Sequence, residues 1–143
     1  MKQKVAIEII SSLLILLFVY AASSKLIDYN EFKVQLKNSG WLSPFAGIIA
    51  WLIPAIELVI SLILMVKDTR VVGLYASLIL LIIFTIYISG MLLSGQHLPC
   101  SCGGVIQSLS WKQHLLFNSF FIILSSSGIV LERKIKSGSN KAT

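Results

Sequence analysis

The chain has 143 residues, of which 56% are hydrophobic and only 13% are charged, and its mean hydropathy is +0.87. Soluble domains carry about 25% charged residues, so this composition excludes an ordinary water-soluble domain and indicates a membrane protein. The net charge of +6 is spread over short segments beside apolar runs, so it gives no support for a nucleic-acid partner.

Four apolar segments are long enough to cross a bilayer, whose hydrocarbon core of about 30 Å needs about 20 helical residues. They comprise residues 5–27, 45–66, 71–94 and 113–131. Little chain lies outside them, so the helices have to bury their polar groups against one another. We therefore predict an all-α integral membrane four-helix bundle, a single domain surrounded by the lipid bilayer. Residues 132–143 form a basic, polar tail that we expect to be disordered.

The distribution of basic residues predicts the orientation of the bundle. An even number of spans places both termini on one side of the membrane, and eight of the 12 Lys and Arg residues fall on that side. They are Lys2, Lys4, Lys67, Arg70, Arg133, Lys134, Lys136 and Lys141. The positive-inside rule then predicts cytoplasmic termini (N-in/C-in), with residues 28–44 and 95–112 on the extracytoplasmic side.

The first span has a competing interpretation as a cleaved signal peptide. Its basic start, its apolar run and the small residues around Val19-Tyr20-Ala21 resemble a secretory signal with a cleavage site. However, Glu8 interrupts the apolar region, and the apolar run continues past the proposed cut. We therefore expect this segment to remain as a span that ends near Lys25, at the outer boundary of the membrane.

The segment after the first span has the pattern of a helix that lies on the membrane surface. Leu26, Tyr29, Phe32 and Leu36 recur at three- and four-residue spacing, with charged residues between them. This spacing predicts a short amphipathic interfacial helix that Gly40 ends.

The second span contains an acidic residue close to the middle of its apolar run. Glu57 follows Pro54 by three residues. An ionisable residue at this depth is costly, so it is a candidate functional residue. In the alternative interpretation, Glu57 is protonated or hydrogen-bonds a neighbouring Ser, Tyr or Asn and serves helix packing. The sequence leaves both interpretations open.

The two cysteines lie in the polar segment between the third and fourth spans. Cys100 and Cys102 are the only cysteines in the chain, and glycines follow them. A disulfide between residues this close forms a very small ring, and strained disulfides are reduced more readily. Lys112 and His114, at the start of the fourth span, are candidates to stabilise a leaving thiolate. Asn118 lies one helical turn beyond His114 on the same face.

Two other interpretations of the cysteines remain open. His97, Cys100, Cys102 and His114 provide two thiolates and two imidazoles, which suit Cu(I) or zinc, although their spacing matches no common zinc motif. The cysteines could also form a static structural disulfide. We rank redox exchange first, a structural disulfide second and metal binding third.

Several short motifs, in this order and spacing, resemble the MauE/DoxX family of small four-helix membrane proteins. The motifs are Ala22-Ser23-Ser24-Lys25-Leu26 with Asp28 and Phe32, Leu52-Ile53-Pro54-Ala55-Ile56-Glu57, Pro99-Cys100-Ser101-Cys102-Gly103, and Trp111 with Asn118. The resemblance implies a multi-pass protein of the bacterial cytoplasmic (inner) membrane. It also implies a role in the redox maturation of exported proteins, with a thioredoxin-like partner and a link to methylamine metabolism. DoxX-type relatives imply a membrane quinone as electron acceptor, by analogy.

The chain also departs from the family pattern at two places. Cys102 is followed by Gly103-Gly104 rather than by Gly and an aromatic residue, and His114 and Phe117 occupy the neighbourhood of a more usual Arg before Asn118. At these two places the family pattern does not support a particular partner or a link to methylamine.

The leading hypothesis is a membrane thiol-disulfide oxidoreductase that acts on an extracytoplasmic thioredoxin-like protein or a Cys-containing client. Cys100 and Cys102 would carry out the exchange, and the supporting residues would be Lys25, Glu57, His97, Lys112, His114 and Asn118. The alternative is a non-catalytic membrane subunit or assembly factor, in which the disulfide is structural and residues 28–38 dock a partner.

Overall fold

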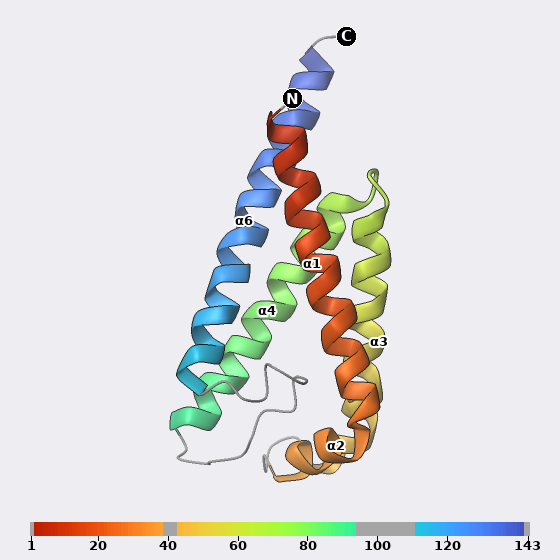
Figure 1. The fold of residues 1–143 in the computed structure, drawn as a ribbon, viewed down its shortest axis with the longest axis vertical. Helices are drawn as coiled ribbons and strands as arrows, with labels where there is room; N and C mark the ends of the chain where they lie inside the picture. Colours follow the sequence, from red (N-terminus) through yellow and green to blue (C-terminus); the bar gives the residue numbers. More distant parts are fainter. Residues whose placement is uncertain (1, 39–42, 94–110, 142–143) are drawn as a thin grey trace.

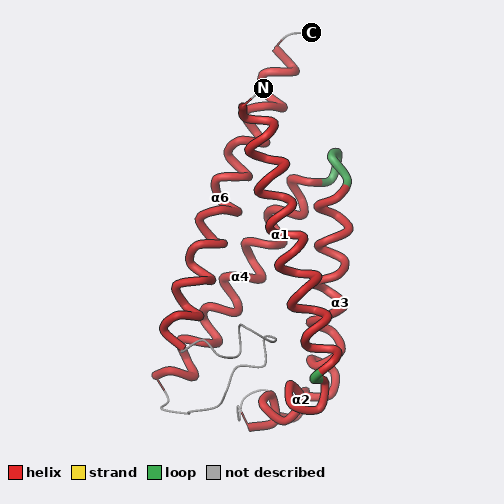
Figure 2. The backbone as a smooth tube through the Cα atoms, viewed as in Figure 1, coloured by secondary structure: helices red, strands yellow, loops and turns green. Residues whose placement is uncertain are grey.

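The structure, a computed structural model, describes residues 2–38, 43–93 and 111–141. Helices account for nearly all of this backbone, and a short turn connects two of them (Figures 1 and 2). The elements are α1 (Lys2–Ile27), α2 (Tyr29–Asn38), the 3-10 helix η1 (Ser43–Phe45), α3 (Ala46–Met65), α4 (Arg70–Leu93) and α6 (Trp111–Lys141). The described residues form no strand.

The prediction of an all-α membrane bundle is confirmed. Four helical segments in the described part of the chain are long and apolar enough to span a membrane, and they are Lys2–Ile27, Ser43–Met65, Arg70–Gly90 and Lys112–Lys141. Their large apolar side chains point outward as well as inward, since Leu16, Ile86 and Ile123 are all exposed. An apolar outer surface around a helical bundle is the arrangement that a lipid environment requires.

The bundle is built from two closely packed helix pairs. α1 packs mainly against α3 and α4 mainly against α6, while contacts of α1 with α6 and of α3 with α4 join the pairs. Leu14 and Phe18 of α1, Leu64 of α3 and Leu74 of α4 are buried in the core between them. In lipid such packing rests on close van der Waals contact rather than on removal of apolar surface from water.

The amphipathic segment after the first span forms α2, which lies across one end of the bundle (Figure 1). Its buried residues Phe32 and Leu36 pack against Ala46 and Ala50 of α3. Tyr29 adds a tilted ring contact with Trp51, with centroids 5.7 Å apart. Phe32 and Leu36, which the helical spacing in the sequence placed on one face, therefore lie on the face of α2 that packs against the bundle.

The expectation of a disordered C-terminal tail is wrong up to Lys141, because α6 continues to that residue. One buried side chain and two contacts hold the first part of this extension to the bundle. Glu132 is buried, the Arg133 guanidinium lies 5.6 Å from the centroid of the Tyr75 ring, and Lys136 Nζ donates to the carbonyl oxygen of Asp68 at 3.5 Å. Composition suggested disorder, but a polar segment that follows a long helix and has contacts of this kind can extend it without a new nucleation step.

A close approach of α3 and α4 leads to the first prediction. A Cβ atom on Gly73 would lie 2.9 Å from both Cγ and Cδ2 of Leu64, whereas one on Gly90 would meet nothing within 4 Å. We expect Gly73→Ala to lower the free energy of unfolding by about 1–3 kcal/mol through overpacking. The matched variant Gly90→Ala should be neutral or more stable by up to about 1 kcal/mol. Denaturant unfolding in detergent micelles measures both, and equal effects would contradict the assigned helix contact.

Candidate functional site

A buried ion pair joins α1 to α3 inside the bundle. Lys25 Nζ, near the end of α1, donates to Glu57 Oε1 at 2.8 Å, and the two side chains are only 3% and 1% exposed. The Lys25 ammonium also lies 5.2 Å from the centroid of the Phe84 ring and 5.9 Å from that of Phe32. Because a cation is attracted to aromatic faces at such distances, groups from α2, α3 and α4 all stabilise the charge of Lys25.

This pair answers one question that the sequence left open. The packing interpretation of Glu57 named Ser, Tyr or Asn as its side-chain partner, but the carboxylate pairs with Lys25. The nearby Ser61 hydroxyl donates instead to the backbone carbonyl of Glu57, at 2.9 Å. Removing two charges from water costs several kcal/mol per ion, and their attraction offsets this only while both partners are present. Loss of either residue would therefore leave the other as a buried charge without a counter-charge.

His114 and Asn118 border the same place from α6. They are one helical turn apart, each is 5% exposed, and with Lys25 and Glu57 they line a cavity of about 40 Å³. The rest of the lining is apolar and consists of Leu17, Phe18, Ala21, Leu81, Phe84 and Phe117. The structure thus brings together four of the six supporting residues that the sequence singled out, and we call Lys25, Glu57, His114 and Asn118 the polar cluster.

Three buried polar atoms of this cluster lack a hydrogen-bond partner in the part of the chain that the structure describes. They are Glu57 Oε2, His114 Nδ1 and Asn118 Nδ2. Buried polar atoms in folded proteins are nearly always paired, because an unpaired one carries the full penalty of its desolvation. The polar cluster therefore has free hydrogen-bonding capacity at a buried position within the bundle.

The remaining predicted site residues are not part of the polar cluster. Lys112 is exposed on the first turn of α6. Cys100, Cys102 and His97 lie outside the described residues, so the cysteine pair and three of the four residues of the metal alternative remain predictions. Within residues 2–38, 43–93 and 111–141, no group of three or more His, Cys, Asp and Glu residues is arranged to hold a metal ion.

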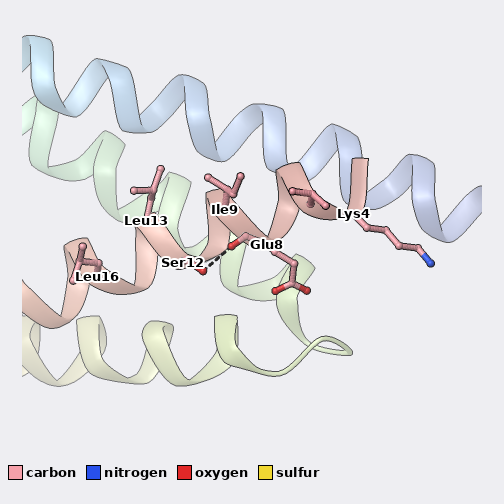
Figure 3. A pocket seen from close by; sticks show the side chains of 7 residues that line it. Lys4, Glu8, Ile9, Ser12, Leu13 and Leu16 are labelled. Carbon is pink, nitrogen blue, oxygen red and sulfur yellow. Dashed lines mark hydrogen bonds between the residues drawn. The ribbon is translucent and has the colours of Figure 1, made fainter. Parts of the chain in front are cut away.

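A shallow groove of about 450 Å³ runs along the N-terminal part of α1 (Figure 3). Its lining residues all come from α1, and most are apolar. At its edge, Glu8 Oε1 lies 3.3 Å from Arg70 Nη2, while the Ser12 hydroxyl donates to the Glu8 carbonyl oxygen at 2.7 Å. The apolar, open character of the groove fits the lipid-facing surface of a single helix.

The fold and the polar cluster together define a small multi-pass membrane protein with a charged site buried in its helical bundle. The family model described as methylamine utilisation protein MauE matches residues 3–131, from α1 through most of α6, and the chain belongs to this family. Comparisons with curated proteins and with solved structures found no match. The resemblance seen in the motifs is therefore confirmed for MauE, while the relation to DoxX stays a prediction.

Proposed function

We propose that this protein is a membrane thiol-disulfide redox protein that supports the oxidation or maturation of exported proteins in methylamine utilisation. The observation that carries the proposal is the position of the chain on either side of the cysteine segment. α4 ends at Leu93 and α6 begins at Trp111, and these two helix ends lie at the end of the bundle where α2 lies (Figure 1). Lys25, His114 and Lys112 are near this same end, on the last turn of α1 and the first turn of α6.

The chemistry that we propose is exchange between a client dithiol and the Cys100–Cys102 disulfide. A client thiolate attacks one sulfur, the disulfide bond breaks, and the other cysteine leaves as a thiolate. A second client thiolate then displaces the first cysteine, so the client gains a disulfide and the Cys100/Cys102 pair is reduced. Positive charge from Lys112 and from the N-terminus of α6 favours the leaving thiolate.

The client is an extracytoplasmic thioredoxin-like protein or another Cys-containing exported protein. The match to the MauE family supports a place in methylamine utilisation, and the family resemblance suggested a thioredoxin-like partner. A membrane quinone was the acceptor expected by analogy with DoxX-type proteins. The polar cluster does not fit a quinone ring, because its cavity of about 40 Å³ is far below the roughly 300 Å³ of the smallest usual ligand pockets. We therefore derive no step through quinone.

Trapping of a mixed disulfide tests this proposal. Cys100→Ser and Cys102→Ser each leave one thiolate that can attack the disulfide of an oxidised client, which releases one client thiolate and forms a mixed disulfide. Because no neighbouring cysteine is left to resolve this bond, one of the two variants should accumulate a disulfide-linked complex with an exported protein. Non-reducing electrophoresis followed by mass spectrometry detects it, and the double variant serves as the control. If neither single variant forms such a complex, and the wild-type thiols stay oxidised in mild reductant, the exchange function is wrong.

The outward face of α2 favours a second candidate function, that of an assembly factor. Phe32 and Leu36 face the bundle, whereas Glu31, Val34 and Lys37 on the other side of the helix are exposed. In this alternative α2 docks a partner subunit, and the cysteines form a fixed bond. Val34→Glu should then abolish co-purification of that partner while both cysteine variants leave it unchanged, which is the reverse of the outcome expected for exchange.

A further inference from the structure

The cavity of the polar cluster lies at the seam between the two helix pairs of the bundle. Lys25 and Glu57 reach it from the α1–α3 pair, and His114 and Asn118 reach it from α6. α4 contributes Leu81 and Phe84, which are apolar. The polar groups of α3 and α6 therefore face a shared space, and none of the hydrogen bonds among the described residues joins Glu57 to either His114 or Asn118.

The three unpartnered atoms around this space form a complementary set. Glu57 Oε2 is an acceptor, Asn118 Nδ2 is a donor, and His114 Nδ1 is a donor or an acceptor according to its tautomer. Their side chains are more than nine-tenths buried, so bulk water does not reach them. A molecule that satisfies all three has to accept one hydrogen bond and donate another over a short distance.

The size of the cavity restricts what that molecule can be. A buried water needs about 10–15 Å³ of space and two to four polar partners, and the cavity of about 40 Å³ meets both conditions. The volume is too small for a drug-sized ligand. The Lys25 ammonium on the cavity lining disfavours a cation. We propose that the cavity is a binding site for ordered water that bridges Glu57 of α3 to His114 and Asn118 of α6.

The bridge has two structural consequences. It supplies the second carboxylate oxygen of Glu57 with a hydrogen bond, which reduces the penalty of burying the Lys25–Glu57 pair. It also attaches the first turns of α6 to α3, and α6 resumes the chain directly after the cysteine segment. The water site thereby fixes the position of the start of α6, whether or not the cysteines exchange electrons.

Nuclear magnetic resonance of the full chain in lipid nanodiscs tests the water site. The chain has two histidines, so the His97→Gln variant leaves His114 as the single imidazole to observe. Magnetisation transferred from water should reach the His114 ring and the Asn118 side-chain amide. If neither group receives it, a polar group of the protein rather than water satisfies these atoms, and the proposal is overturned.

Substitutions at two neighbouring residues test whether Asn118 helps to hold the water. Asn118→Leu replaces one of the three partners with an apolar side chain that fills the cavity, so the transfer from water to His114 should fall to background. Ser119→Leu introduces the same side chain at the next residue, which is exposed, and should leave the transfer unchanged. Unaltered transfer in Asn118→Leu would overturn the bridging geometry. If Asn118→Leu does not fold, the measurement on the His97→Gln chain alone decides the question.

Discussion

Lys25→Met is expected to lower the free energy of unfolding by about 3–5 kcal/mol, because it leaves the Glu57 carboxylate buried without its counter-charge. The side chain of Glu57 is 1% exposed, so bulk water does not replace the ammonium that lies 2.8 Å from Oε1, and one bound water carries no compensating charge. Methionine has nearly the length of lysine and fills the same space, so the expected loss reflects charge rather than volume.

The double variant Lys25→Met/Glu57→Leu tests whether the loss of stability comes from the unpaired charge of Glu57. Removing both charges also removes both desolvation penalties, so the double variant should recover most of the stability lost in Lys25→Met. Lys37→Met is the matched control, because Lys37 is exposed on α2 and should lose less than about 0.5 kcal/mol. Denaturant unfolding in micelles measures all three variants. A double variant no more stable than Lys25→Met would contradict the ion pair as the source of the effect.

The orientation of the bundle in the membrane should give an all-or-none labelling result. We expect the end of the bundle that carries α2 to face outward, because most Lys and Arg residues belong to the opposite end. In a chain with Cys100→Ser and Cys102→Ser, single reporter cysteines can be placed at two exposed positions, Lys37→Cys on α2 and Gly138→Cys on α6. A membrane-impermeant thiol reagent added to intact cells should label the first reporter completely and leave the second unlabelled.

Permeabilised cells provide the control for this experiment, since both reporter cysteines should then react. The positions are suitable because a side chain at residue 138 meets nothing within 4 Å and Lys37 makes no ion pair among the described residues. The reverse labelling pattern would place the polar cluster nearer to the cytoplasm and would exclude an extracytoplasmic client.

The spans and α2 could be predicted from the sequence because their signals are local. Apolar runs of about 20 residues and a three- to four-residue spacing depend only on neighbouring positions, and the spacing of Phe32 and Leu36 identified the face that packs on α3. The helical extension of α6 was missed, since composition alone does not reveal that Arg133 contacts Tyr75 on the neighbouring helix α4.

The four residues of the polar cluster were each singled out from the sequence, but the sequence did not show that all four lie together. Lys25 and Glu57 are 32 positions apart, and one lies near a helix end while the other lies near the middle of an apolar run. Their pairing depends on how far α1 and α3 are displaced along each other, which no local pattern records. Two opposite charges in adjacent spans were the available signal. The four-residue spacing of His114 and Asn118 did indicate a shared face, and both residues line the cavity.

The redox state of Cys100 and Cys102 in living cells tests the proposed exchange function most directly. Rapid acid quenching followed by alkylation with a thiol reagent that adds mass separates the oxidised from the reduced protein on a gel. We predict a mixture of both forms that shifts toward the reduced form when exported dithiol proteins are overproduced. A pair that stays fully oxidised under all these conditions, or fully reduced, would contradict a role in thiol-disulfide exchange.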